Sequence, residues 1–189
     1  LVVHFEDGTG RILGAQGVGQ KGIDKRIDVF ATAIRGGLTI NDLIDTDLAY
    51  SPPYGAAKDG VNMAGMMGEN VLDGVTDLWY AEDLPEAMQD CLIVDCRRPD
   101  EYAGGHIPGA LNVPHTQVRG RIEEIREAAA GRPIRVHCRS GMRSYIAERI
   151  LKQEGFDVKN LSGGMLTLKE AMAGGVTPPV KLVFGDSRE

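Results

Sequence analysis

The sequence predicts an α/β fold for the second half of the chain, preceded by a smaller α+β region. The run over residues 92–97, which is apolar and ends in charge, indicates a buried strand, and residues 134–137 form a short β-like run. A helix-like run over residues 144–152 follows the second of these strands after a short loop. The 189 residues leave room for more than one domain, because a domain usually takes ~100–200 residues.

The N-terminal part predicts, in order, a hairpin, a helix, a short helix and a proline-rich loop. Residues 1–5 and 11–17 flank a Gly-rich turn signal and form the expected hairpin. Apolar side chains recur at helical spacing over residues 23–34, and a Gly-Gly pair ends that helix. Residues 38–43 suggest a short second helix. Residues 50–54, with two central prolines, then impose an extended segment.

The last helix of this part is expected within residues 58–72. Its apolar side chains form a stripe of the kind that usually packs in a core or a subunit interface rather than around a ligand. The members of the stripe are Val61, Met63, Met66 and Met67.

Residues 17–22 match the Gly-x-Gly-x-x-Gly pattern of dinucleotide-binding sites. That pattern also requires a second parallel strand that ends in an acid about 20 residues further on. A Gly-Gly pair and polar, helix-like sequence follow the first helix instead. We therefore do not expect a nucleotide at this loop.

The segment that carries most of the chemistry begins at Cys138. This cysteine follows a predicted strand and opens a loop that contains Arg139, Gly141 and Arg143, after which a helix starts. Such an order aims backbone N–H groups and a helix N-terminus at the sulfur, and both favour negative charge. With the two arginines, they lower the thiol pKa and favour the reactive thiolate. The alternative is a buried structural cysteine.

Loop length separates two enzyme classes that use such a cradle. Cysteine phosphatases have five residues between the cysteine and the arginine, whereas four separate Cys138 from Arg143. Ser144 stands where the phosphatase arginine would be. The shorter loop resembles that of rhodanese-type sulfurtransferases, in which the loop encircles one sulfur atom carried as a persulfide. A cysteine phosphatase or arsenate reductase stays as a less favoured alternative.

Flanking motifs extend the resemblance to rhodaneses over residues 78–175. They are Asp95-Cys96-Arg97, then Glu101-Tyr102, then residues 105–110 (Gly-His-Ile-Pro-Gly-Ala), and downstream residues 160–164 (Asn-Leu-Ser-Gly-Gly). The resemblance implies a rhodanese-like α/β domain with a central, mainly parallel sheet. It also implies that Cys138 lies at the C-terminal end of a strand, where open α/β sheets place their ligands.

The resemblance implies a sulfurtransferase in which Cys138 is the catalytic nucleophile. A sulfane-sulfur donor and a thiol acceptor would be its small-molecule partners. A non-catalytic rhodanese-like module for docking or dimerisation is the main rival, although such modules commonly lose the loop cysteine. The residues expected to bind the transferred sulfur and the anionic donor are Arg139, Ser140, Gly141, Met142 and Arg143.

Several residues around this loop are expected to support it. Asp95 and Arg97 lie at a strand end as scaffold charges, and Arg97 could pair with Glu101. His106 precedes a Pro-Gly turn and is expected to hydrogen-bond the backbone. His137 alternates with Cys138 along the strand and so faces the other side of the sheet.

Cys96 departs from the family pattern, because an aliphatic residue is usual at this position of the Asp-x-Arg segment. Two interpretations stay open. Cys96 is either a resolving thiol or, as its strand setting favours, a small core residue.

Residues 1–72 resemble the C-terminal dimerisation domain of flavin-dependent pyridine nucleotide-disulfide oxidoreductases, above all coenzyme A-disulfide reductases. The resemblance rests on residues 10–16, residues 24–28 and the segment Tyr50-Ser51-Pro52-Pro53-Tyr54, followed by Asp59 and Asn62. It implies a homodimer formed through residues 1–72, with Tyr50 or Tyr54 reaching the partner subunit's reductase site. The family domain appears here without its opening strand.

Together the two halves resemble the C-terminal part of a coenzyme A-disulfide reductase–rhodanese fusion. The resemblance implies FAD, NAD(P)H and coenzyme A for the longer parent, and none of them, nor reductase activity, for this chain. The chain starts without methionine inside an apolar run, which agrees with a C-terminal piece. Residues 73–77 would form the linker. Residues 176–189 would form a tail whose apolar segment, residues 180–184, either adds an edge strand or packs on the other domain.

Composition excludes several classes of function. The net charge of -6 argues against nucleic acid as a partner. No apolar run approaches the ~20 residues that cross a bilayer. The three cysteines and four histidines show no zinc-type spacing. An odd number of cysteines with one reactive thiol favours a reducing cytoplasm.

Overall fold

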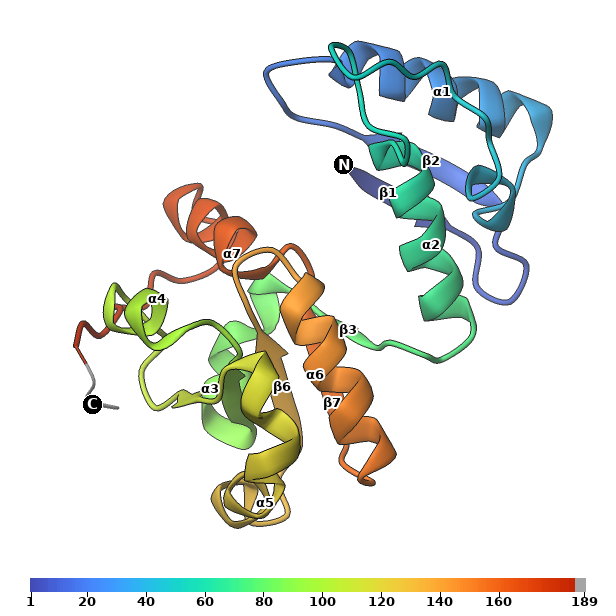
Figure 1. Ribbon diagram of the computed structural model, residues 1–189. Coiled ribbons are helices and arrows are strands. Elements are labelled where there is room, and N and C mark those ends of the chain that lie inside the picture. The colour runs from blue at the N-terminus through green and yellow to red at the C-terminus, as the bar shows by residue number, and fades with distance from the viewer. Residues whose placement is uncertain (186–189) are drawn as a thin grey trace. The chain divides into compact units, whose positions relative to one another are not determined.

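The computed structural model describes residues 1–185, which divide into two compact units between Val75 and Thr76. Figure 1 shows the first unit with its hairpin and helices, and the second with a central sheet. The division falls inside the predicted linker. Thr76 and the backbone N–H of Asp77 bind the buried carboxylate of Glu148, so both residues belong to the second unit.

The first unit has the predicted order of elements. Strands β1 (Val2–Phe5) and β2 (Ile12–Gln16) pair in an antiparallel hairpin. Helix α1 (Ile23–Gly36), the 3-10 turn η1 (Asn41–Leu43) and helix α2 (Gly60–Leu72) follow. The second parallel strand that a dinucleotide fold needs after α1 does not occur among the described residues of this unit; η1 follows instead.

Asp59 and Asn62, two residues of the dimerisation-domain motif, hold this unit together. Asp59 caps α2 and forms a two-pronged ion pair with Arg26 of α1, with N···O distances of 2.9 and 2.8 Å. The Asn62 side-chain amide donates to the carbonyls of residues 43, 44 and 46. The motif thus fastens α1 and the loop after η1 to the start of α2. The buried apolar side chains between these elements are Ile12, Phe30, Ala33, Ile40, Leu43 and Val61.

The second unit is built on a five-stranded parallel sheet, as predicted. The strand order is β3 (Leu78–Trp79), β7 (Val158–Leu161), β6 (Ile134–His137), β4 (Leu92–Asp95) and β5 (Leu111–Asn112). Every neighbouring pair in this sheet is parallel.

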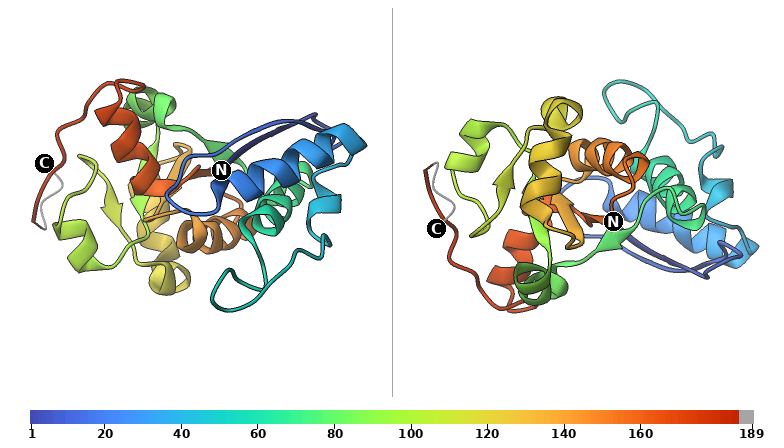
Figure 2. Two further views of the ribbon diagram at one scale, coloured as in Figure 1. Left: turned by 90° about the horizontal axis from the view of Figure 1, so that it is seen from above. Right: turned by 90° about the horizontal axis from the view of Figure 1, so that it is seen from below.

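Helices cover both faces of this sheet, because its strands alternate apolar side chains toward each face. Side chains of α5 (Ile122–Ala129) and α6 (Met142–Gln153) fill one core. The other core contains residues from α3 (Leu84–Asp90), α4 (Pro99–Ala103) and α7 (Gly164–Ala173). Figure 2 shows α5 and α6 together on one side of the sheet. The short 3-10 segments are η2 (Ala81–Asp83) and η3 (His115–Arg121).

The tail joins the second unit. Val183 exchanges two backbone hydrogen bonds with His106, at 2.9 and 3.0 Å, in an isolated antiparallel bridge. The tail therefore pairs with the loop after α4 through one isolated bridge and adds no edge strand to the five-stranded sheet. Residues 186–189 of the predicted tail lie outside the described residues.

Candidate active site

Cys138 lies at the C-terminal end of β6, immediately before the loop that leads into α6. Its side chain is buried, with 1% exposed, at the edge of the core that α5 and α6 cover. This burial agrees with the alternative interpretation of Cys138 as a buried structural cysteine. The polar surroundings of the sulfur distinguish Cys138 from an ordinary core cysteine.

The loop backbone turns its N–H groups toward the Cys138 sulfur. The amide of Gly141 donates to Sγ at 3.2 Å. Gly141 caps α6 with φ 111°, a conformation that favours glycine. Its carbonyl accepts hydrogen bonds from the Ser144 hydroxyl and the Asn160 side-chain amide, both at 3.1 Å. These bonds fix the Gly141 carbonyl and so restrict the backbone of the residue whose N–H points at the sulfur.

The sulfur has a lowered pKa in this setting. Burial raises the pKa of the Cys138 thiol, but the Ser144 hydroxyl and the amides of Ser144, Ser140 and Gly141 outweigh it. Since α6 starts here, the amides are also the positive end of a helix. The arrangement therefore favours a thiolate at Cys138.

The arginine of the loop has a partner that the sequence did not predict. Arg143 forms a two-pronged ion pair with Glu101 of α4, with N···O distances of 2.6 and 2.9 Å. Because of this pair, the pKa of Glu101 falls from its ordinary 4.5 to about 2. The pKa of Arg143 rises, chiefly through Glu101 and further through the charge of Cys138.

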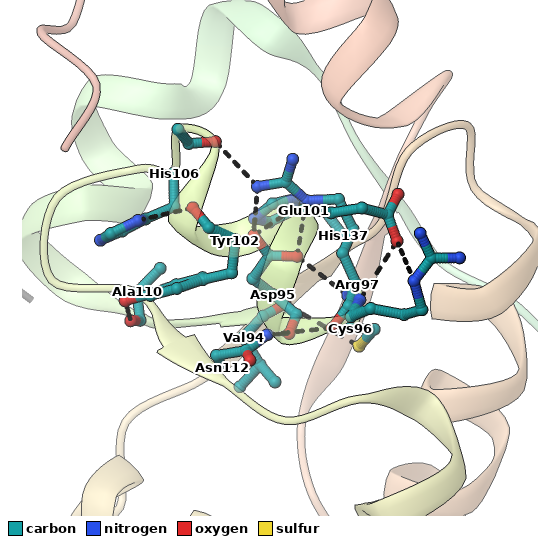
Figure 3. A network of polar contacts seen from close by, with 12 residues as sticks. Val94, Asp95, Cys96, Arg97, Glu101, Tyr102, His106, Ala110, Asn112 and His137 are labelled. Carbon is teal, nitrogen blue, oxygen red and sulfur yellow. Dashed lines mark hydrogen bonds and ion pairs between the residues drawn. The ribbon is translucent and has the colours of Figure 1, made fainter. Parts of the chain in front are cut away.

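The prediction that Arg97 pairs with Glu101 is wrong. Arg97 binds Asp95 instead, through three N···O contacts of 2.6–3.0 Å, and also donates to the Gly105 carbonyl (Figure 3). Both side chains are buried, and the carboxylate and guanidinium match in geometry. Asp95 and Arg97 thus tie the end of β4 to the segment after α4.

The two histidines are placed as expected. His106 Nδ1 lies 3.0 Å from the Tyr102 carbonyl, and its ring stacks on the Tyr102 ring at 3.5 Å (Figure 3). His137 is buried on the sheet face opposite Cys138, with Nε2 3.7 Å from Asp95 Oδ2. Burial lowers the pKa of His137 and outweighs the opposite effect of Asp95.

Gly164 is a site residue that sequence reasoning missed. A Cβ atom at Gly164 would lie 2.7 Å from the Ser140 nitrogen and 2.8 Å from the Arg139 carbonyl carbon and oxygen. The first amides of α7, from Met165 and Leu166, donate to the carbonyls of Cys138 and Arg139. The Gly-Gly pair at 163–164 was the available signal, but it indicated only a turn.

The remaining predicted residues are exposed. Arg139, Ser140 and Met142 lie on the solvent side of the loop and at the first turn of α6. Tyr50 and Tyr54 lie in the first unit with 53% and 91% of their surface exposed, and their contact with a partner subunit stays a prediction.

The part of the chain from residue 1 to 185 contains no group of three His, Cys, Asp or Glu side chains arranged to bind a metal ion. Within the same residues, no helix combines the length and apolar character needed to span a membrane.

Two known protein families match the two units. Residues 80–171 match the rhodanese-like domain, and residues 2–59 match the dimerisation domain of pyridine nucleotide-disulphide oxidoreductases. The coenzyme A disulfide reductases of Staphylococcus haemolyticus (strain JCSC1435) and Staphylococcus aureus (strain bovine RF122 / ET3-1) are 46% and 43% identical over 65 residues. That stretch is 34% of this chain and 15% of each relative.

Two solved structures resemble most of the chain. Reduced Bacillus anthracis CoADR-RHD is 37% identical with a TM-score of 0.86, over 96% of this chain and 31% of that one. The NAD-dependent persulfide reductase from A. fulgidus is 40% identical with a TM-score of 0.76, over 86% of this chain and 29% of that one. The chain carries a pyridine nucleotide-disulphide oxidoreductase dimerisation domain followed by a rhodanese-like domain, and it corresponds to the C-terminal part of the coenzyme A disulfide reductase–rhodanese proteins.

Proposed function

We propose that the rhodanese-like domain is a sulfurtransferase that carries sulfane sulfur as a persulfide on Cys138. The single observation that carries this proposal is the hydrogen bond from the Gly141 amide to Sγ, 3.2 Å long, at the N-terminus of α6. An amide aimed at the sulfur stabilises its negative charge and so favours the nucleophilic form.

The transfer has two steps. The Cys138 thiolate attacks the outer sulfur of an anionic donor such as thiosulfate, a polysulfide or a persulfide. The donor's S–S bond breaks, and the rest of the donor leaves with the bonding electron pair. A thiol acceptor then attacks the outer sulfur of the Cys138 persulfide and returns Cys138 as thiolate. The exposed Arg139 attracts the anionic donor, and the loop amides hold the transferred sulfur.

Loop geometry favours this reaction over phosphate ester hydrolysis. Ser144 occupies the position of the phosphatase arginine, and its buried hydroxyl binds the Gly141 carbonyl within the loop. The only arginine at the end of the loop, Arg143, directs two terminal nitrogens at Glu101. A tetrahedral phosphate needs several free donors around it, whereas a single sulfur atom needs fewer.

The names of the relatives suggest a role for the longer protein. We propose that in the parent the sulfur on Cys138 passes to the thiol of coenzyme A, and that domains outside this chain bind FAD and NAD(P)H. The Gly-rich loop at residues 17–22 does not fit a dinucleotide, because η1 follows α1 in place of a parallel strand. Tyr50 and Tyr54 are proposed to reach the partner subunit's reductase site in a homodimer formed through residues 1–72.

Turnover with thiosulfate and cyanide tests the proposal, because cyanide removes the outer sulfur as thiocyanate. We expect thiocyanate from the wild-type chain and none from Cys138→Ser. Cys91→Ser is the matched control. Cys91 is also buried, but it lies just before the first residue of β4, at the N-terminal edge of the sheet and away from the Cys138 loop. Absence of thiocyanate from the folded wild-type chain would support a docking module, and hydrolysis of an aryl phosphate would support a phosphatase.

A further inference from the structure

Two cysteines follow neighbouring strands at the same edge of the sheet. β4 and β6 are parallel, and Val94 pairs with Val136 and Asp95 with His137. Cys96 and Cys138 directly follow the two strands, and the Cys96 amide donates to the His137 carbonyl at 2.8 Å. Neighbouring strands lie about 4.8 Å apart. That spacing is within the ~4.4–6.8 Å that a disulfide requires between Cα atoms.

Both thiols face the same side of the sheet. Cys96 and Cys138 belong to the core that α5 and α6 cover, together with Val94 and Val136. Both cysteines are free, and Cys96 has 0% of its surface exposed. Cys91 does not share this cluster. Cys138 thus has one buried thiol neighbour across the strand pair, and no external thiol can take that position.

We propose that Cys96 is a resolving thiol that converts the sulfur on Cys138 to hydrogen sulfide. Its sulfur attacks Sγ of the Cys138 persulfide, the bond from Sγ to the outer sulfur breaks, and the outer sulfur leaves as hydrosulfide. The leaving sulfur keeps the bonding electron pair and takes the Cys96 proton. A Cys96–Cys138 disulfide remains. Two molecules of a small external thiol reduce it and leave as their own disulfide. This inference rests on the proposed function.

The chemistry of the two sulfurs agrees with these roles. The Gly141 amide approaches Sγ of Cys138 from the loop, where the outer sulfur would be held, while Cys96 lies on the adjacent strand end. Attack on Sγ from the strand therefore expels the sulfur toward the loop. Burial raises the pKa of the Cys96 thiol well above its ordinary value, and the charges of Asp95 and Cys138 raise it further. Because the thiolate and not the thiol is the nucleophile, the Cys96 proton passes to the negatively charged outer sulfur of the persulfide as the Cys96 sulfur attacks.

A time course of intact mass tests the proposal. The reduced chain is loaded with polysulfide, freed of donor and small thiols, and sampled for mass and for released sulfide. We expect the wild type to lose its extra sulfur atom, release one equivalent of sulfide and end two hydrogen atoms lighter than the reduced chain. In Cys96→Ala the extra sulfur should persist. Cys96→Val, which restores side-chain volume, should behave like Cys96→Ala, and Cys91→Ala like the wild type.

Digestion with trypsin, followed by mass measurement of the peptides, identifies the Cys96–Cys138 disulfide. In Cys91→Ala, residues 59–97 contain Cys96 as their only cysteine and residues 136–139 contain Cys138, so a linked pair of these peptides defines the disulfide. Equal persistence of the extra sulfur in wild type and both Cys96 variants would overturn the resolving role alone. If instead Cys96→Ala and Cys96→Val never acquire sulfur on Cys138 and the wild type forms no thiocyanate from cyanide, the proposed function fails with it.

Discussion

The contact of Gly164 with the loop leads to the sharpest structural prediction. Replacing Gly164 with alanine places a Cβ atom 2.7–2.8 Å from the backbone of Arg139 and Ser140. Backbone atoms cannot rotate away as a flexible side chain can, so either the loop or the start of α7 must move. Gly164 also has φ 61°, where alanine is strained.

The expected magnitude has two parts. A left-handed alanine costs about 1–2 kcal/mol, and an overpacked site costs about 1–3 kcal/mol more. Gly164→Ala should therefore lower the free energy of unfolding by about 2–5 kcal/mol. Gly155 has φ 81° with nothing within 4 Å of its Cβ position, so Gly155→Ala carries the strain without the clash. It should cost only about 1–2 kcal/mol.

The same change should impair sulfur transfer. A displaced loop loses the Gly141 hydrogen bond to the thiolate, and a hydrogen bond to a charged group contributes about 1.5–3 kcal/mol. That free energy corresponds to a roughly ten- to hundredfold loss of turnover. Urea unfolding and thiocyanate formation measure the two effects. If Gly164→Ala matches Gly155→Ala in both assays, the close contact of Gly164 with the loop does not position the loop around Cys138.

Three further changes probe the support of the loop. Glu101→Gln removes a carboxyl whose pKa is depressed to about 2. The stability that this group contributes is present above pH 4.5 and is lost as the pH falls toward 2. The variant should lack this part of the acid dependence in urea unfolding, and an unchanged dependence would contradict the pairing. Ser144→Ala should raise the pKa of Cys138 and move the pH profile of thiocyanate formation to higher pH, whereas an unshifted profile would exclude the hydroxyl as a cause. Asp95→Asn leaves the Arg97 guanidinium buried without its carboxylate and should lower the free energy of unfolding by about 3–5 kcal/mol, and a loss below ~1 kcal/mol would contradict this role.

Local patterns were enough to predict the elements of the first unit and some of those of the second. The turn signal at residues 7–10, the helical spacing over residues 23–34 and the strand run at 134–137 agree with the structure, and the run at 92–97 contains β4, which ends at Asp95. These features depend on neighbours within a few residues. The parallel sheet followed from the family resemblance, since periodicity alone cannot set strand direction.

Contacts between distant segments could not be predicted in the same way. Arg97, Arg143, Asp95 and Glu101 permit more than one set of ion pairs, and only the placement of α4 beside the loop selects the observed one. The proximity of Cys96 and Cys138 depends on β4 lying next to β6, although β5 comes between them in the chain. Gly164 likewise reaches the loop only because α7 begins beside it.

The charge of the Cys138 sulfur is the central claim, and a titration of thiolate absorbance in the ultraviolet tests it most directly. The difference between the wild type and Cys138→Ser isolates this sulfur from Cys91 and Cys96. The loop amides and the Ser144 hydroxyl predict a midpoint below the ~8.5 of an unperturbed thiol. A midpoint at or above that value would contradict the account, because burial would then outweigh the loop.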